Sequence, residues 1–273
     1  MVPSYLLSLR EGLEAALIIG IVLGALRKVH RTELRSVVWG GVFSATLVSV
    51  IVAFVLYRLG AAFEGEAEEI FEGFTMLLAA GVLTWMIFWM HRQSRSIKSE
   101  LETGVRQASI TRGKSALFSL AFLAVVREGI ELALFLTAAS YATDSQQTIG
   151  GALLGLGTSV LLGWSLFATT ARLDLRRFFQ VTGILLILFA AGLVAHGVHE
   201  FIEVGWIPAL IEHVWDINPL IDENSTVGAL LKALFGYNGN PALTEVLAYI
   251  GYFVLVAFSL RRRQVQLPAI QEA

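Results

Sequence analysis

A five-residue pattern, Arg-Glu-Gly-apolar-Glu, occurs twice in this chain, at residues 10–14 and again at residues 127–131. On a helix the two glutamates of one copy share a face, and the arginine lies four residues before the second glutamate, close enough to pair with it. Clustered carboxylates suit hard, oxygen-seeking cations such as Fe(III), Mn(II), Ca2+ or Mg2+. The predicted metal ligands are Glu11, Glu14, Glu128 and Glu131, with Arg10 and Arg127 supporting them.

Each copy lies in a run of otherwise uncharged residues, 4–26 and 116–140. A charged side chain at the centre of a bilayer costs about 2.5–3.5 kcal/mol, so six uncompensated charges would cost roughly 15–20 kcal/mol. A salt bridge that only fixes helix packing is the simpler interpretation of one such motif. Two copies carry four carboxylates against two guanidinium groups, a formal charge of −2 if all are ionised. That excess favours a site for a cation.

The composition is that of a membrane protein. Of the 273 residues, 56% are hydrophobic and 15% are charged, whereas a soluble domain carries about 25% charged residues. The absence of cysteine excludes disulfides, thiolate zinc sites and iron–sulfur clusters, so any metal must be held by oxygen or imidazole ligands. The first apolar run is too long for the hydrophobic region of a signal peptide, and no basic segment precedes it, so we expect a retained first span.

Seven runs are apolar and long enough to cross a bilayer as helices, which requires about 20 residues. Loops rich in arginine and lysine alternate with acidic loops, and the positive-inside rule then places the N-terminus outside and the C-terminus inside. We therefore expect an all-α integral membrane protein with seven transmembrane helices. The predicted spans are 4–26, 37–57, 73–90, 116–140, 148–170, 178–198 and 242–260.

The doubled motif also indicates an internal duplication. Gly41 and Ser44 have counterparts in Gly155 and Thr158, and residues 79–81 share Ala-Ala-Gly with residues 190–192. Each unit holds three spans, an odd number, so the second unit is predicted to be inverted relative to the first, as in many transporters. The predicted single transmembrane domain, 1–273, comprises a first three-helix repeat (1–92), a second (113–200), an extracytoplasmic loop (201–241) and a seventh helix (242–260) outside the 3+3 inverted repeat.

Two pieces of the long loop, 207–214 and 227–235, are predicted to be short helices on the outer surface. Capping residues at 222–225 precede the second piece, and Gly236 is expected to end it. Trp39, Trp85 and Trp89 near cytoplasmic span ends are expected to be interfacial residues without a functional role.

Further acidic and histidine residues gather at the predicted outer ends of the spans. Residues 196–203 could present one polar helical face, and an acidic stretch precedes the third span. The alternatives are a solvated helix end and carboxylates that complement the helix macrodipole. Glu245, just inside the outer end of the seventh span, is a weaker candidate for the ion pathway. The possible entrance site consists of His196, His199, Glu200, Glu203, Glu64, Glu68 and Glu72.

With its flanking residues, the doubled motif resembles the iron permease family, which includes fungal high-affinity iron permeases and bacterial Efe-type iron permeases. The similar segments are Leu9–Leu17, Phe71–Phe74, Leu83–Met86, Phe88–Met90, Ala190–Leu193 and Phe235–Tyr237. The resemblance covers nearly the whole chain. It implies a transporter, not an enzyme, that imports iron as Fe(III) through Glu11, Glu14, Glu128 and Glu131, with Arg10 and Arg127 in support.

The resemblance also implies partners outside the membrane: a peroxidase or oxidase that oxidises iron, and a periplasmic iron-binding protein. No permanently bound cofactor and no nucleic-acid partner are expected. Two alternatives stay open at this stage. One is a transporter of another cation, such as lead or manganese; the other is a membrane-embedded enzyme with a carboxylate-bridged metal pair, although the motifs lack the Glu-x-x-His pairing of di-iron bundles.

Overall fold

The structure is a computed structural model that describes the chain except residues 94–96, 108–112, 143–144, 169–174, 224 and 266–273. The regular elements of the described residues are all helical. They are α1 (Val2–Lys28), the short 3-10 helix η1 (Thr32–Leu34), α2 (Arg35–Gly60), α3 (Glu66–Gln93), α4 (Ile97–Gln107), α5 (Gly113–Ala142), α6 (Ser145–Ala168), α7 (Leu175–Glu203), α8 (Thr226–Phe235) and α9 (Leu243–Val265).

Each predicted span overlaps one long helix, with bounds that differ by a few residues at most ends; the predicted end of the fifth span, 169–170, lies outside the described residues. The third begins at Glu66 rather than at residue 73, because acidic residues in its first turn complement the positive end of the helix dipole. In the described part of the chain, α2, α3, α6, α7 and α9 are long and apolar enough to cross a membrane. The 27 residues of α1 and 30 residues of α5 are also long enough, but three charged motif residues interrupt each.

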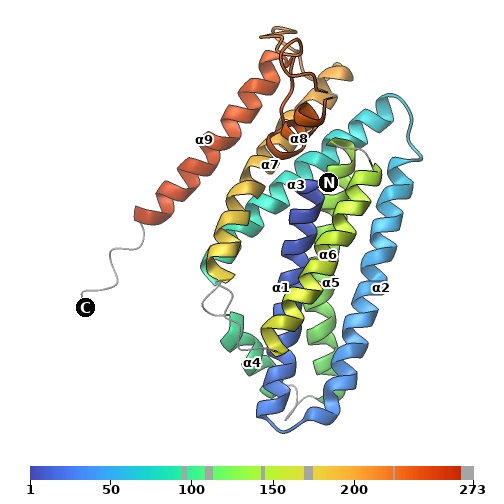
Figure 1. The fold of residues 1–273 in the computed structure, drawn as a ribbon, viewed down its shortest axis with the longest axis vertical. Helices are drawn as coiled ribbons and strands as arrows, with labels where there is room; N and C mark the ends of the chain where they lie inside the picture. The colour runs from blue at the N-terminus through green and yellow to red at the C-terminus, as the bar shows by residue number, and fades with distance from the viewer. Residues whose placement is uncertain (94–96, 108–112, 143–144, 169–174, 224, 266–273) are drawn as a thin grey trace.

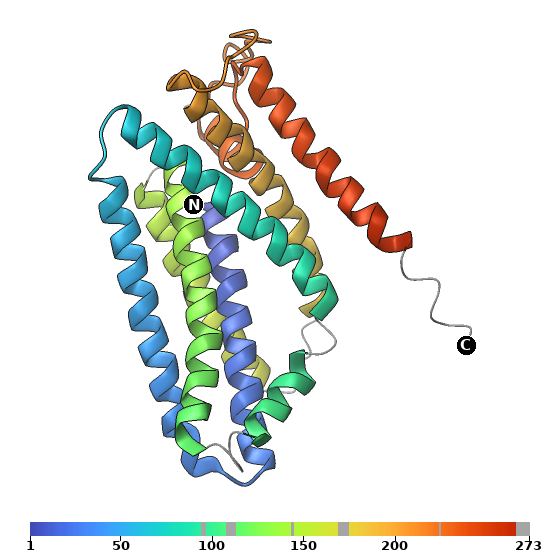
Figure 2. The same cartoon turned by 180° about the vertical axis from the view of Figure 1, so that it is seen from behind.

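The long helices pair between the two halves of the chain (Figures 1 and 2). The main pairs are α1 with α6, α2 with α5, and α3 with α7, while α1 also contacts α5 near the centre. In the first pair, Gly151 lies against Met1, and Gly163 lies against Ala16. Because the residue numbers rise in the same direction along both helices, α1 and α6 run parallel. The pairing is symmetric when the first three long helices are exchanged with the next three, as an inverted repeat predicts.

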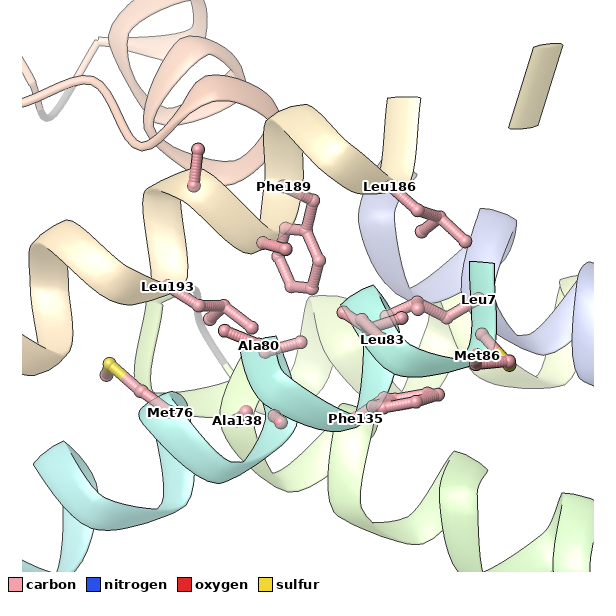
Figure 3. Packing of buried hydrophobic residues seen from close by; sticks show 14 of the residues in the cluster. Leu7, Met76, Ala80, Leu83, Met86, Phe135, Ala138, Leu186, Phe189 and Leu193 are labelled. Carbon is pink, nitrogen blue, oxygen red and sulfur yellow. The ribbon is translucent and has the colours of Figure 1, made fainter. Parts of the chain in front are cut away.

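Two apolar clusters support this arrangement. One is built around α3, whose buried side chains lie between α7 on one side and α1 and α5 on the other (Figure 3). It includes Leu7, Met76, Leu83, Met86, Phe135, Leu186, Phe189 and Leu193. The second lies toward the C-terminal end of α1 and includes Val22, Leu26, Val38, Leu117, Ala121, Val125 and Val126. The motif residues therefore have a packed apolar frame.

Two short elements differ from expectation. Helix α4 was missed because it is too short and polar to be a span, although Ile97, Leu101 and Val105 recur every four residues along one face. It lies against α1, where Lys28 Nζ is 2.7 Å from Glu102 Oε1.

The helix predicted at 207–214 is wrong. Pro208 has no backbone N–H that could donate a hydrogen bond within a helix. Other backbone groups of this segment form hydrogen bonds with residues just before α9 and with the first residue of α9. Val214 N donates to Pro241 O at 3.0 Å, and Leu243 N donates to Ile211 O at 3.0 Å. The other predicted piece is confirmed as α8, which Ser225 caps through a bond from Gly228 N and Gly236 ends with φ 66°.

Candidate metal site

The two motifs meet where α1 and α5 contact each other. Glu11, Glu128 and Glu131 each offer a carboxylate oxygen, and these oxygens lie within 4.8 Å of one another. The three side chains are buried, with exposures of 1%, 5% and 8%. The Oε2 atom of each has no hydrogen-bond partner among the described residues. Buried carboxylate oxygens without donors are costly, so this arrangement favours a cation between them.

Each motif arginine pairs with the glutamate four residues later, which confirms the predicted spacing. Arg10 Nη2 is 3.1 Å from Glu14 Oε1, and Arg127 Nε donates to Glu131 Oε1 at 2.8 Å. Arg10 is 1% exposed, and its Nη1 also lies 3.4 Å from Glu11 Oε1. Glu14 is therefore the ion-pair partner of Arg10 and lies next to the cluster of three carboxylates. It is close enough to Glu131 for the two carboxylates to repel each other.

One segment of α3 contacts both arginines. The Sδ atom of Met86 accepts from Arg10 Nη1 at 3.3 Å. The guanidinium carbon of Arg127 lies 4.2 Å from the ring centre of Trp89 and 5.5 Å from that of Trp85. A cation over an indole face is stabilised by the ring quadrupole. The interpretation of these two tryptophans as interfacial residues alone is therefore incomplete; their four-residue spacing on a helix was the available signal.

The glycine of each motif permits close approach of a neighbouring helix. A β-carbon at Gly12 would overlap the hydroxyl of Ser159 in α6, and one at Gly129 would overlap the hydroxyl of Ser49 in α2. The same relationship thus occurs in both motifs. Sequence reasoning did not identify the serines, because each lies far along the chain from the glycine it contacts.

The predicted entrance residues of α7 divide into two groups. His199 Nδ1 is 3.0 Å from Glu245 Oε1, and His199 Nε2 is 3.3 Å from Glu203 Oε1. The Nδ1 of His196 instead lies 3.0 Å from the Gly192 carbonyl of its own helix. Glu245 also accepts from the backbone N–H of Ala242, so it caps the start of α9 while it binds the histidine.

The acidic stretch at the start of α3 lies near the end of α7. Glu72 is partly buried and within electrostatic range of Glu200, whereas Glu64 and Glu68 are exposed. Among the described residues, however, the cluster of Glu11, Glu128 and Glu131 is the one group of three in which each residue offers a metal-ligating atom within 4.8 Å of the others. The structure thus separates a buried carboxylate cluster from a looser collection of polar groups.

Comparison with known proteins agrees with this arrangement. A profile of the iron permease FTR1 family matches residues 1–265. The chain belongs to this family. The "Ferrous iron permease EfeU" of Shigella sonnei is 36% identical over 273 aligned residues, which cover 96% of this chain and 97% of the relative. The protein of the same name from Yersinia pestis is 33% identical, with 100% and 98% covered. No solved structure gives a significant match.

The motifs therefore occur in a permease, a multi-pass membrane transport protein and not an enzyme. The five apolar helices agree with this class. Both charged motifs lie inside the segment that the family profile matches, as do α8 and α9.

Proposed function

We propose that this permease imports iron across a bacterial plasma membrane and that the ion passes through the cluster of Glu11, Glu128 and Glu131. The observation that carries the proposal is the convergence of three buried carboxylates from α1 and α5 with oxygens within 4.8 Å. Carboxylate oxygens are suitable ligands for iron, and a site built from two helices can change its geometry when the helices move.

The charges of the site suit a transported cation. Four carboxylates and two guanidinium groups leave a formal charge of −2 if all are ionised. Arg10 and Arg127 each neutralise one carboxylate by direct pairing, so a cation supplies the remaining compensation. Glu14 holds Arg10 in place and becomes an additional ligand when this pair separates. Seven spans in a 3+3 inverted repeat, with the N-terminus outside, provide the frame for alternating access to this site.

The ligands also support a proposal for the oxidation state of the ion. An all-carboxylate site without thiolate or imidazole favours the harder ion, Fe(III), over Fe(II). The relatives are named for ferrous iron. We therefore propose that ferrous iron is oxidised outside the membrane, each ion giving one electron to an extracytoplasmic oxidase or peroxidase, and that a periplasmic iron-binding protein delivers it.

Uptake of radioactive iron into proteoliposomes tests the function. Glu128→Gln is nearly isosteric and removes one negative charge, so we expect uptake to fall by roughly tenfold or more while the amount of folded protein is unchanged. Glu212→Gln, at an exposed position outside the long helices, is the matched control and should transport normally. Normal uptake by Glu128→Gln would reject the cluster as the ion site.

The same assay separates the ions. Uptake is measured with ferrous iron kept reduced by ascorbate, with ferric citrate, and with manganese or lead as competitors. Faster uptake of ferric iron supports the proposed oxidation state. Equal transport of manganese or lead would show that the carboxylates do not select iron.

A further inference from the structure

A row of three buried oxygen-bearing residues lies on one face of α1. Ser4, Ser8 and Glu11 are spaced by four and three residues, and their exposures are 0%, 0% and 1%. The hydroxyls of both serines and Oε2 of the glutamate have no hydrogen-bond partner among the described residues. A buried hydroxyl without a partner costs about 1–3 kcal/mol. The row is therefore unfavourable unless another ligand binds it.

Serine and threonine side chains in this structure normally avoid that cost. Ser49, Thr84 and Thr137 each donate to the carbonyl four residues earlier, at 2.6–2.9 Å. Ser8 also has such a carbonyl in α1 but does not use it. Its hydroxyl thus stays available for a group that is not part of the chain.

The corresponding positions in the second motif helix are apolar. Ala121 and Val125 lie 117 positions after Ser4 and Ser8, the same interval that separates the two motifs. Both are buried in the second apolar cluster, together with Val22 and Leu26. Polar groups therefore lead to the carboxylate site along this face of α1, whereas the two corresponding positions of α5 are hydrocarbon.

We propose that Ser4 and Ser8 form an access path along which a hydrated metal cation reaches Glu11 from the N-terminal end of α1. The inference rests on the proposed function for the nature of the ion. Seven residues of helix place Ser4 about 10 Å from Glu11 along the axis. The two hydroxyls divide this distance into steps, at each of which an oxygen atom replaces a water ligand of the cation.

Helix α6 is the element that closes this path. Gly155 lies so near α1 that a β-carbon there would overlap the carbonyl of Tyr5, and Gly151 approaches the carbonyl of Met1 in the same way. A β-carbon at Gly155 would also overlap the β-carbon of Ser8, so α6 covers α1 beside this serine, and a small separation of the two helices admits an ion there. The contact surface thus consists of two glycines of α6 against Ser8 and against the backbone of α1 at Met1 and Tyr5.

Cysteine accessibility tests the path, since the chain has no native cysteine. Ser8→Cys and its matched counterpart Val125→Cys are exposed to Ag+, a small thiol-reactive cation, from each side of the membrane in turn. The remaining free thiols are then counted with a fluorescent maleimide after unfolding in detergent. We expect Ser8→Cys to react at least tenfold faster than Val125→Cys from the side of the α1 N-terminus. Equal rates from that side would overturn the path.

Iron added before Ag+ should slow the reaction of Ser8→Cys several-fold. This readout does not require transport, so the two proposals fail separately. Fast labelling without protection by iron supports the path and counts against iron as its ion. Protection by iron in Glu128→Gln as well would show that the ion binds the row before it reaches the carboxylates.

Removal of the hydroxyl provides a second test. Ser8→Ala should raise the iron concentration for half-maximal uptake about tenfold. It should leave the thermal stability unchanged or higher, because an unsatisfied buried hydroxyl is lost. Uptake equal to that of the parent chain at low iron would overturn the role of the hydroxyl.

Discussion

Gly12 of α1 lies directly against Ser159 of α6, with no room for a β-carbon between them. Gly129 of α5 has the same relationship with Ser49 of α2. The motif glycine therefore sets the distance between the helix that carries the carboxylates and the helix that covers them. Each contact joins a helix of the first half of the chain to a helix of the second half. The packing of the covering helices is therefore tied to the position of the site.

Gly12→Ala should reduce the amount of folded permease and abolish most uptake, because the new methyl group overlaps Ser159 and forces α1 from α6. Overpacking of this kind costs about 1–3 kcal/mol. Combining it with Ser159→Gly should restore much of the folded protein, measured by fluorescence-detected size-exclusion chromatography. Gly24→Ala is the control and should fold normally, because a β-carbon added at Gly24 would meet no neighbouring heavy atom within 4 Å. Failure of Ser159→Gly to rescue would contradict the proposed cause.

Arg10→Leu should lower the amount of folded protein more than any single glutamate-to-glutamine variant. The arginine is 1% exposed and compensates Glu11 and Glu14, and removal of one partner of a buried ion pair costs about 3–5 kcal/mol. Adding Glu14→Gln removes the stranded charge and should recover part of the loss. Immunoblots of membrane fractions measure the outcome. The idea fails if Arg10→Leu accumulates like the parent chain.

Trp89→Leu should weaken iron uptake without loss of folded protein. The indole holds the Arg127 guanidinium beside Glu131, and a cation–π contact of about 0.5–2 kcal/mol corresponds to a roughly 2–30-fold change. We expect the iron concentration for half-maximal uptake to rise by this factor, while the maximal rate stays similar. Trp89→Phe should recover part of the loss. Trp39→Leu, an exposed tryptophan of α2 that contacts Phe43, is the control. An effect of the same size in both leucine variants would point to the membrane interface instead.

His199→Ala and Glu200→Gln should each slow uptake at low iron and leave the rate at saturating iron largely intact. These groups lie at the end of α7 and do not belong to the three-carboxylate cluster, so we expect them to raise the local cation concentration rather than to form the central site. Concentration series in proteoliposomes measure both regimes. Complete loss at every concentration would place them in the central site.

A parallel Glu245→Ala variant should lose about 1 kcal/mol of stability, because it removes the cap of α9.

The predicted membrane orientation can be tested with single cysteines at exposed positions. Glu64→Cys, between α2 and α3, should react with an impermeant maleimide applied outside intact cells. His30→Cys, between α1 and α2, should react only after the membrane is permeabilised. Ser4 is unsuitable for this purpose, because the structure buries it completely. Reaction of position 30 from outside would reverse the topology.

The sequence was informative where charge stood out against an apolar background. It located the seven long helices of the described residues, although α3 begins seven residues earlier than predicted, and it predicted that each arginine pairs with the glutamate four residues later, because both depend on the pattern along one helix. It did not separate Glu14 from the other three carboxylates, since that depends on the rotation of α1 against α5. The contacts of Trp89 with Arg127 and of Ser49 with Gly129 join distant helices, and helical periodicity alone does not reveal such pairs.

The prediction for 207–214 failed for a related reason. Its apolar residues fit a helix, but its backbone hydrogen bonds go to residues near 240, more than twenty positions away. Helix α4 was missed because the criterion for a span excluded it. Local pattern thus determined the long helices, and tertiary contacts decided the short segments.

The pairing of α1 with α6 has a consequence for synthesis of the chain. About 140 residues separate the ends of these helices, so at about 5–20 residues per second the first helix waits roughly 7–28 s for its partner to leave the ribosome. For the first part of that interval, until α5 emerges, the first motif has no second arginine motif nearby, and Arg10 compensates its two carboxylates within α1. The i to i+4 ion pair of Arg10 with Glu14 is an interaction of the finished site that α1 can form alone, and it lowers the cost of holding the nascent helix in the lipid.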